Sequence, residues 1–441
     1  MSTHGRPKGE CSGVRKHEGC LISTHGRPKG ESSAGGGMTL LFESPRNVEP
    51  SLRGRTVHVV GRLTPSVFSF LYPATQSIGA TGAPQTVIAI DDSVGREHLR
   101  ELRPDIAVIS VPDQASPWAR SRALYHYLAE VARCTRIAAL HLHGILPGLA
   151  GARFVRQFDD SAMQVYMSPY SSRALTSHHL LRPLLLGLVR VQLRRSRQQP
   201  IVNLKLDARL MKSLASQPVR VVESAAADVF FSTPRNEARR PLLLAGGRDE
   251  SVLPAARFIQ LAVLLGDDDL AMSFNWIGTA HPTTENAFRA AGIGHFRPTS
   301  AAERAQRLGT AWLWISPQEE ERGFPIGLVE AMASGVPCVA QDTEAHRDVL
   351  DDTGAGFLCT SPTEMMQRVA ELVDSSELRQ RMGDAGRAAA TARFSEAEFS
   401  RRLLQAYAPA PSALISSASV PDTSPAAPEA DAALSIEKSS S

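Results

Sequence analysis

The sequence predicts an α/β protein with two successive parallel sheets. Short apolar segments alternate with helical stretches, a pattern typical of parallel strands that are covered by helices on both faces. The alternation weakens at residues 223–240, which have the polar, Pro-containing sequence of a linker, and then it restarts. At 441 residues the chain is long enough for two ordinary domains.

The first half of the chain supplies the strands of one sheet. Strands are expected at 55–62, 85–90, 106–111, 137–143 and 163–167, and helices at 65–80 and 118–133. Pro65 suits the first turn of the first helix, where its missing N–H costs nothing. This half is predicted to form an N-terminal domain over residues 53–225.

The second half repeats the pattern. Strands are expected at 241–245, 272–277, 312–316 and 338–340, and helices at 254–265 and 301–308. They define a C-terminal domain over residues 226–394. An amphipathic helix follows at 395–408, with Ser395 as its N-cap.

The two ends of the chain differ in composition from the rest. Residues 1–52 are rich in Gly, Ser, Lys and Arg, and they carry STHGRPKGE twice, at 2–10 and 23–31. Residues 409–441 are rich in Ala, Pro, Ser and Asp. Neither segment has apolar periodicity, and two short copies cannot build a repeat architecture, so both ends are predicted to be disordered.

Composition excludes several classes of function. The chain is 43% hydrophobic and 21% charged, as in soluble globular proteins, and its net charge of +3 is too small to indicate a nucleic-acid partner. It has no apolar run of membrane-spanning length and no signal-like leader. Its five cysteines form no CxxC pair, which favours a reducing compartment. These observations predict a cytoplasmic protein.

The most informative segment is GFPIGLVEAMASGVPCVA, residues 323–340. A Gly-Phe-Pro turn leads into a short helix, Gly335 ends that helix, and Pro337 prevents its continuation before a strand begins. The N-terminus of a helix suits a phosphate, and a carboxylate nearby, Glu330, can hold the vicinal hydroxyls of a ribose. The segment therefore indicates a site for a nucleoside diphosphate.

This segment closely resembles the signature of family-4 glycosyltransferases, and the resemblance extends more weakly over residues 55–408. It implies a GT-B fold, in which two Rossmann-like domains face each other across a cleft. It also implies a retaining enzyme that moves a sugar from a nucleoside diphosphate to a saccharide acceptor, lipid-linked in many members. No cofactor or metal is implied, and bacterial envelope polysaccharide assembly is the expected setting.

The resemblance assigns roles on the donor side. Glu330 would hold the ribose, while Arg248 and the backbone of Gly323, Phe324 and Pro325 would stabilise the leaving diphosphate. Arg248 follows the strand at 241–245, where a guanidinium suits an anion. Gly61, at the end of the first strand, is the expected point of close backbone approach. In the family the leaving phosphate itself takes the acceptor's proton.

Three features of the family's donor site are altered. Thr64-Pro65-Ser66 stands about where the family has a Gly-Gly pair that approaches the donor phosphate. The family has a Glu eight positions before the ribose-binding one, and Arg322 stands there. If Arg322 is a one-residue insertion, Glu321 takes that catalytic role. The family's Lys after the Gly-Arg is also missing, since Leu253 and Pro254 occupy its place, and Arg257 on the next helix is a possible substitute.

On the acceptor side, His143 ends the fourth strand, where it would reach the cleft, and His141 faces the same side. A buried, hydrogen-bonded histidine is an equally open interpretation of His143. Tyr170 stands where the family commonly has a second His. A metal site built on these histidines would need further ligands, and none can be identified in the sequence. Asp267-Asp268-Asp269 contains the Asp-x-Asp pattern of a metal-binding motif, but it precedes a predicted strand and is therefore predicted to be a turn.

Two alternatives stay open. Arginines and histidines interleave with leucines between residues 173 and 197, which fits either an anionic membrane surface or a solvated basic helix. The altered positions also fit a non-catalytic GT-B protein that binds a sugar nucleotide or partners an active transferase.

Overall fold

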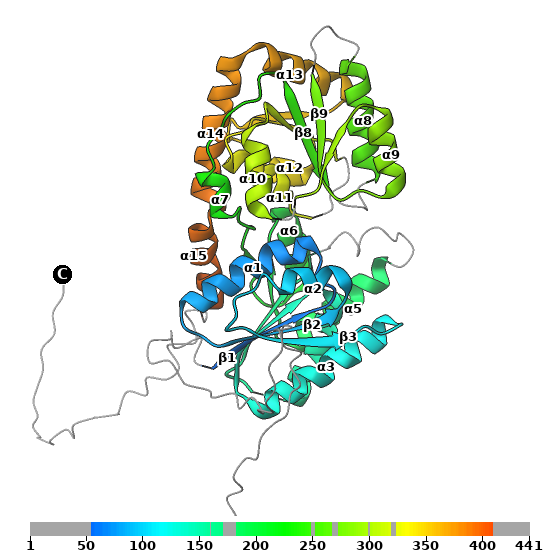
Figure 1. Ribbon diagram of the computed structural model, residues 1–441. Coiled ribbons are helices and arrows are strands. Elements are labelled where there is room, and N and C mark those ends of the chain that lie inside the picture. The colour runs from blue at the N-terminus through cyan, green and yellow to red at the C-terminus, as the bar shows by residue number, and fades with distance from the viewer. Residues whose placement is uncertain are drawn as a thin grey trace, which may run out of the picture. The chain divides into compact units, whose positions relative to one another are not determined.

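The computed structural model describes residues 54–158, 160–170, 182–247, 252–266, 272–298, 300–318 and 323–408 (Figure 1). The predictions of disorder for 1–52 and 409–441 fall almost wholly outside these ranges. The described residues contain two parallel sheets, as the alternating pattern predicted.

The first sheet has seven strands in the order β3-β2-β1-β4-β5-β6-β7, and every pairing is parallel. The strands are β1 (Arg55–Val60), β2 (Gln85–Asp91), β3 (Ala107–Pro112), β4 (Ile137–His143), β5 (Gln164–Ser168), β6 (Gln199–Val202) and β7 (Arg220–Val221). The helices of this half are α1 (Pro65–Ala80), α2 (Ser93–Leu99), α3 (Pro117–Cys134), α4 (Ile145–Gln157), α5 (Arg182–Arg195) and α6 (Lys205–Leu214).

The second sheet has six strands in the order β10-β9-β8-β11-β12-β13, again all parallel. They are β8 (Leu242–Gly247), β9 (Ser273–Gly278), β10 (Gly294–Phe296), β11 (Leu313–Ser316), β12 (Cys338–Gln341) and β13 (Gly356–Cys359). The helices are α7 (Asp228–Ser232), α8 (Val252–Gly266), α9 (Pro282–Ala290), α10 (Ala301–Gly309), α11 (Ile326–Ala333), α12 (Glu344–Leu350), α13 (Pro362–Asp374), α14 (Ser376–Phe394) and α15 (Glu396–Tyr407).

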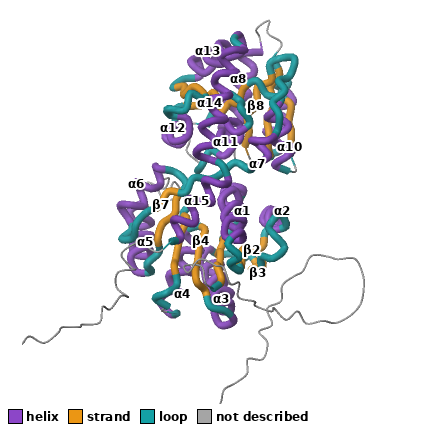
Figure 2. The backbone as a smooth tube through the Cα atoms, turned by 90° about the vertical axis from the view of Figure 1, so that its left-hand side faces the viewer, coloured by secondary structure: helices purple, strands orange, loops and turns teal. Residues whose placement is uncertain are grey.

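Helices cover both faces of each sheet (Figure 2). In the first half, side chains of α3, α4 and α6 such as Leu128, Phe154 and Met211 form one core with the strands, and α1 contributes to the other face. Strand β1 is buried along its whole length, and this includes Arg55, Thr56 and His58 beside its three valines. The central strands are therefore held from both sides, and their carboxyl ends form a fixed edge.

The last helix, α15, packs against α1 of the first half rather than against the second sheet. Its Phe399 and Leu403 are buried in one cluster with Phe70 of α1 and Tyr166 of β5. Tyr407 stacks on Tyr166 with ring centroids 4.3 Å apart. The C-terminal end of the described chain thus completes the core of the N-terminal half.

The sequence missed four short strands. β6, β7, β10 and β13 contain only four, two, three and four residues, and such lengths carry no usable period. The segment expected to be a linker includes the single turn of α7, whose Phe230 is fully buried. Apolar burial, rather than propensity, holds that turn in place.

Candidate functional site

The Gly-Phe-Pro turn forms the entry to α11 as predicted. Gly323 has a φ of +100°, in a region that L-residues rarely adopt, and no side chain caps the N-terminus of α11. The ring of Phe324 packs edge-on against Phe394 at 6.0 Å. Gly335 has a φ of +71° just after the helix, which confirms its predicted role as a terminator. A helix N-terminus that lacks a side-chain cap and follows a glycine turn can receive an anion.

Glu330 lies one turn into α11 and is only 9% exposed. Its carboxylate accepts two bonds from Arg304 of α10, from Nη2 to Oε1 at 2.8 Å and from Nε to Oε2 at 3.3 Å. Burial lowers the pKa of Arg304, but the carboxylate outweighs this effect and leaves the pKa above its ordinary value. Because each carboxylate oxygen has two lone pairs, this pairing leaves one on each oxygen for a further donor.

The carboxyl ends of β8 and β9 lie close together because glycines occupy them. A Cβ at Gly246 would come within 2.8 Å of the Ile277 carbonyl oxygen, and one at Gly278 would lie 2.1 Å from the Gly247 carbonyl oxygen. Arg248 follows directly but is outside the described residues. The edge of the sheet that precedes it is therefore bare backbone.

Arg257 lies on α8, and its Nη1 donates to the carbonyl oxygen of Pro317 at 3.5 Å. Pro317 follows β11 and leads into residues 319–322, which are outside the described residues. Glu321 and Arg322 fall in that gap, so the choice between them stays a prediction. Arg257 is held at the base of the loop that carries both.

On the first sheet, Gly61 follows β1, and its carbonyl oxygen accepts from the amide of Ile90. A Cβ there would make only ordinary contact with Pro147, at 3.6 Å. The surrounding protein therefore does not by itself require a glycine at this position. Its role in close approach to a donor stays a prediction.

His143 and Tyr170 are brought together at the carboxyl ends of β4 and β5. The two rings are stacked with centroids 5.7 Å apart, and Tyr170 Oη lies 2.8 Å from His143 Nδ1. His143 is 2% exposed, and its Nε2 lies 3.0 Å from His58 Nδ1. His141 faces the same side, as predicted, with its ring 4.1 Å from that of His143. Both ring nitrogens of His143 therefore have protein partners, and the side chain is buried.

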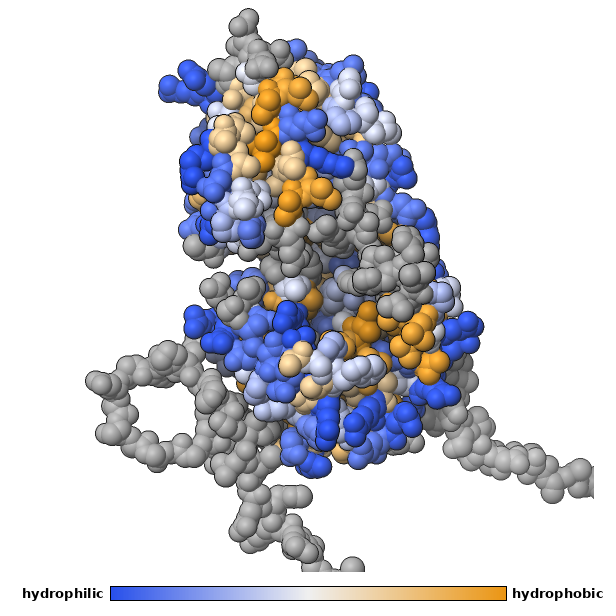
Figure 3. Space-filling view, turned by 90° about the vertical axis from the view of Figure 1, so that its right-hand side faces the viewer, coloured by the Kyte–Doolittle hydropathy of each residue, from blue (hydrophilic) through white to orange (hydrophobic). Residues whose placement is uncertain are grey.

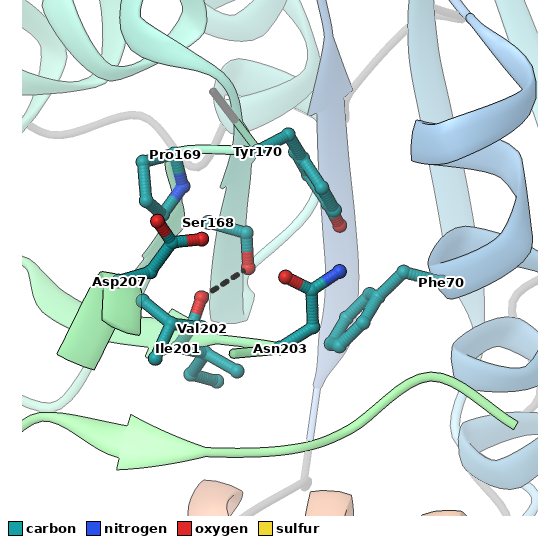
Figure 4. Close-up of a pocket in the computed structure, with 8 residues that line it drawn as sticks. All are labelled: Phe70, Ser168, Pro169, Tyr170, Ile201, Val202, Asn203 and Asp207. Carbon is teal, nitrogen blue, oxygen red and sulfur yellow. Dashed lines mark hydrogen bonds between the residues drawn. The ribbon is translucent and has the colours of Figure 1, made fainter. Parts of the chain in front are cut away.

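The depression beside Tyr170 lies at the carboxyl ends of β5 and β6 (Figure 4). It is lined by Phe70, Ser168, Pro169, Tyr170, Ile201, Val202, Asn203 and Asp207. Ligands of open parallel sheets bind outside the carboxyl ends of strands. The side chains that line the depression are almost all buried, and the depression has no room for a ligand as it stands, so it marks this edge of the sheet without forming an open saccharide site.

The helix α5 presents an apolar stripe outward. Leu184, Leu188 and Val191 are 62%, 47% and 48% exposed, and the neighbouring Arg190 and Arg194 are exposed as well. Figure 3 shows apolar side chains gathered on the face of the molecule that carries α5. Among the described residues, no helix is both long and apolar enough to cross a bilayer.

Sequence reasoning missed Arg304 and His58. Arg304 is 26 positions from Glu330 in an unremarkable helix, and only the folded chain joins the two. His58 sits inside an apolar strand, where a single His resembles any buried polar residue. The alternation that placed His141 and His143 on one face could also have placed His58 there, but only with the register of β1 against β4, which pairs His58 with His141.

Comparison with known proteins agrees with this geometry. Residues 298–389 match the family model described as glycosyl transferases group 1, a range that includes Arg304, the Gly-Phe-Pro turn and Glu330. The chain is 28% identical over 192 residues to a phosphatidyl-myo-inositol mannosyltransferase of Mycobacterium tuberculosis, covering 41% of this chain and 51% of that protein. It is 32% identical over 108 residues to the Mycobacterium leprae protein of that name, covering 24% and 29%. The matches thus span about half or less of these relatives.

Solved structures share the whole two-sheet architecture. Sucrose-phosphate synthase from Thermosynechococcus elongatus superposes with a TM-score of 0.67 at 14% identity, over 82% of this chain and all of that one. HepE of Anabaena, solved with UDP and glucose, gives 0.65 at 12% identity, over 79% and 98%. At such identities the likeness is one of fold, and the GT-B fold expected from the sequence is confirmed.

Proposed function

We propose that the chain is an active, retaining glycosyltransferase of the family-4 type, a proposal supported by the family match over residues 298–389 and by the mannosyltransferase relatives. It would move a sugar from a nucleoside diphosphate to a saccharide acceptor. The observation that carries this proposal is the position of Glu330, one turn behind an uncapped helix N-terminus and a glycine turn.

The donor nucleoside would be held by Glu330. A ribose presents two vicinal hydroxyls, and the lone pairs that Arg304 leaves on the two carboxylate oxygens match that pair of donors. The diphosphate would lie at the N-terminus of α11, near Arg248 and the backbone of Gly323. Support comes from HepE, which has been solved with UDP and with UDP-glucose.

The transfer step breaks the bond between the anomeric carbon and the leaving phosphate oxygen. A bond to the acceptor oxygen forms on the same face, which gives retention, and the acceptor's proton passes to the leaving diphosphate. Glu321 would face the transferred sugar. The protein's contribution is placement of the reactants and stabilisation of the departing charge, so no separate protein base or metal is needed.

The acceptor would lie on the first sheet, beside Tyr170. The curated relatives are named for a phosphatidyl-myo-inositol acceptor, which supports a lipid-linked saccharide and a setting in bacterial envelope assembly. The exposed stripe and arginines of α5 supply the means to approach an anionic membrane from the cytoplasmic side.

Donor turnover tests the transferase proposal. Purified protein is incubated with UDP-, GDP-, ADP- and dTDP-linked sugars and a panel of lipid-linked and free saccharides, and release of the nucleoside diphosphate is followed. We expect release with one donor and its loss in Glu330→Ala and Arg248→Ala. The control Glu371→Gln, on exposed α13, should retain activity.

Vesicle cosedimentation tests the membrane setting separately. We expect binding to vesicles that contain phosphatidylglycerol and weaker binding by Leu188→Ser. Equal pelleting with neutral and anionic vesicles would remove the membrane from the proposal and leave the transferase intact.

A non-catalytic role is the second candidate. It is favoured by Tyr170, which stands in place of a family His and is engaged with His143. Saturable donor binding by the wild type without turnover on any acceptor would support this candidate over the first.

A further inference from the structure

Three buried histidines form a cluster on one face of the first sheet. His58, His141 and His143 offer ring nitrogens that all lie within 4.8 Å of one another, a grouping that a metal ion could in principle use. A metal needs a bare nitrogen from each ring pointing at one common place. The hydrogen bonds of the cluster decide whether such nitrogens exist.

The first chain of bonds runs through two of the rings. His58 Nδ1 lies 3.0 Å from His143 Nε2, and His143 Nδ1 lies 2.8 Å from the Tyr170 hydroxyl. Burial lowers the pKa of His58 to about 4, so its ring is neutral and only one of its nitrogens carries a proton. His58 Nε2 is buried and has no hydrogen-bond partner among the described residues.

The bonds of this chain are compatible with either direction of donation. A neutral His143 donates from one ring nitrogen and accepts at the other, so it bridges Tyr170 and His58 in both cases.

A second chain of bonds fixes the tautomer of His141. The Ser168 hydroxyl donates to the Ile201 carbonyl oxygen, as the dashed line in Figure 4 shows, so its oxygen accepts from His141 Nε2 at 2.9 Å. His141 Nδ1 then accepts from the Tyr407 hydroxyl at 2.7 Å. Both ring nitrogens of His141 and of His143 therefore have protein partners, so the cluster is a neutral hydrogen-bond network rather than a metal site.

Tyr170 is the outer end of this network and has an unusual backbone. Its φ is +49°, which is uncommon for a residue with a side chain. This conformation costs free energy, so it persists only where surrounding contacts compensate for that cost. The enforcing contacts are visible: its hydroxyl bonds to His143, its ring stacks on the same imidazole, and Phe70 packs edge-on at 5.8 Å.

What the network holds in place is the end of β5. Tyr170 forms part of the wall of the depression at the carboxyl ends of β5 and β6. Its carbonyl oxygen would lie 3.8 Å from a Cβ built on Gly323, so the same residue also adjoins the Gly-Phe-Pro turn. A shift of this backbone would alter the acceptor side directly.

We propose that Tyr170 is a positioning residue of the acceptor side, whose hydroxyl, anchored through His143 and His58, holds the backbone after β5 in its left-handed conformation. The proposal rests on the proposed transferase function for its catalytic consequence. The network itself is a property of the folded chain and can be tested without turnover.

The test compares Tyr170→Phe with Tyr125→Phe, which also removes a buried hydroxyl's bond to a side chain of this half but lies away from the cluster. Long-range ¹H–¹⁵N spectra of the imidazoles should show His58, His141 and His143 as neutral in the wild type, with His141 as the Nε2–H tautomer. Tyr170→Phe should move the Nδ1 resonance of His143 and leave that of His141. Tyr125→Phe should move neither.

Kinetics supply the second readout. In Tyr170→Phe we expect donor affinity within about twofold of the wild type, and kcat/KM for the acceptor lowered about tenfold, the size of effect that a small misplacement produces. Wild-type acceptor kinetics from Tyr170→Phe, or an unchanged Nδ1 resonance of His143 in that variant, would overturn the proposal. So would a stoichiometric metal bound to the cluster in the purified protein. Absence of turnover in the wild type would instead count against the transferase function, while the spectra still report on the network.

Discussion

Arg304 is the residue that most changes the interpretation of the donor site. Without it, Glu330 would be an isolated, nearly buried carboxylate whose charge is costly to bury. The fork of Arg304 neutralises this charge and fixes the plane of the carboxylate by contacting both of its oxygens. Binding of a ribose would then require no reorientation of Glu330.

Replacing Arg304 by Ala should therefore weaken donor binding. We expect the donor Kd to rise about tenfold, equivalent to about 1.4 kcal/mol, because the carboxylate loses its fixed orientation. Arg304→Lys keeps the positive charge but loses the two-pronged guanidinium geometry, so its donor Kd should lie between those of the wild type and Arg304→Ala. Calorimetric titration measures the effect, with Arg289→Ala on exposed α9 as the control. Donor binding as tight in Arg304→Ala as in the wild type would show that the pair is only structural.

The buried histidines predict acid sensitivity. Burial lowers the pKa of all three, that of His58 to about 4. Between pH 6.5, the ordinary pKa, and about 4, His58 is protonated in the unfolded chain but neutral in the folded protein. The free energy of unfolding is therefore highest above this pH window and decreases as the pH falls through it. The shift of His58 alone corresponds to about 3 kcal/mol.

Urea unfolding at several pH values between about 7 and about 4.5 measures this loss. His126→Gln, which changes an exposed histidine of α3, should leave the slope unchanged. A free energy of unfolding that stays level across the window would mean that these histidines are charged or solvated in the folded protein.

At the scale of elements, the α11 turn is fixed by its packing against α14. A Cβ at Gly383, in the middle of α14, would come within 2.2 Å of the Gly335 carbonyl oxygen. The side chain of Arg235 also donates to that oxygen. The close approach of helix and turn explains why a helix interior carries a glycine, which is otherwise unfavourable there.

Two matched substitutions separate packing from helix propensity. Gly383→Ala should destabilise the protein by about 2 kcal/mol or more, because backbone must move to admit the methyl group. Gly187→Ala on α5 has no atom within 4 Å of the new Cβ and should stabilise by about 0.5–1 kcal/mol. Thermal or urea unfolding measures both, and stabilisation by both substitutions would contradict the described packing of α14.

At the scale of the whole molecule, the sequence predicted the two sheets and the α11 signature, because long apolar strands and the Gly-Phe-Pro segment carry local signals. It missed β6, β7, β10 and β13, which are too short for a period, and the partners Arg304 and His58, which meet their targets only through tertiary contacts. Of the two interpretations of His143 that the sequence left open, the structure has the buried, hydrogen-bonded one. Strand alternation gives the face on which a side chain lies but not the partners that bury it.

The central claim is that this fold holds a nucleoside-diphosphate sugar through Glu330. Calorimetric titration of the full chain with the donor panel, comparing wild type, Glu330→Gln and the control Glu371→Gln, tests it most directly. Glu330→Gln keeps the shape of the side chain but removes the charge and one acceptor. We predict saturable binding of one donor by the wild type and the control, with Kd raised at least about tenfold in Glu330→Gln. Equal affinity in all three proteins, or no binding by the wild type, would contradict the account.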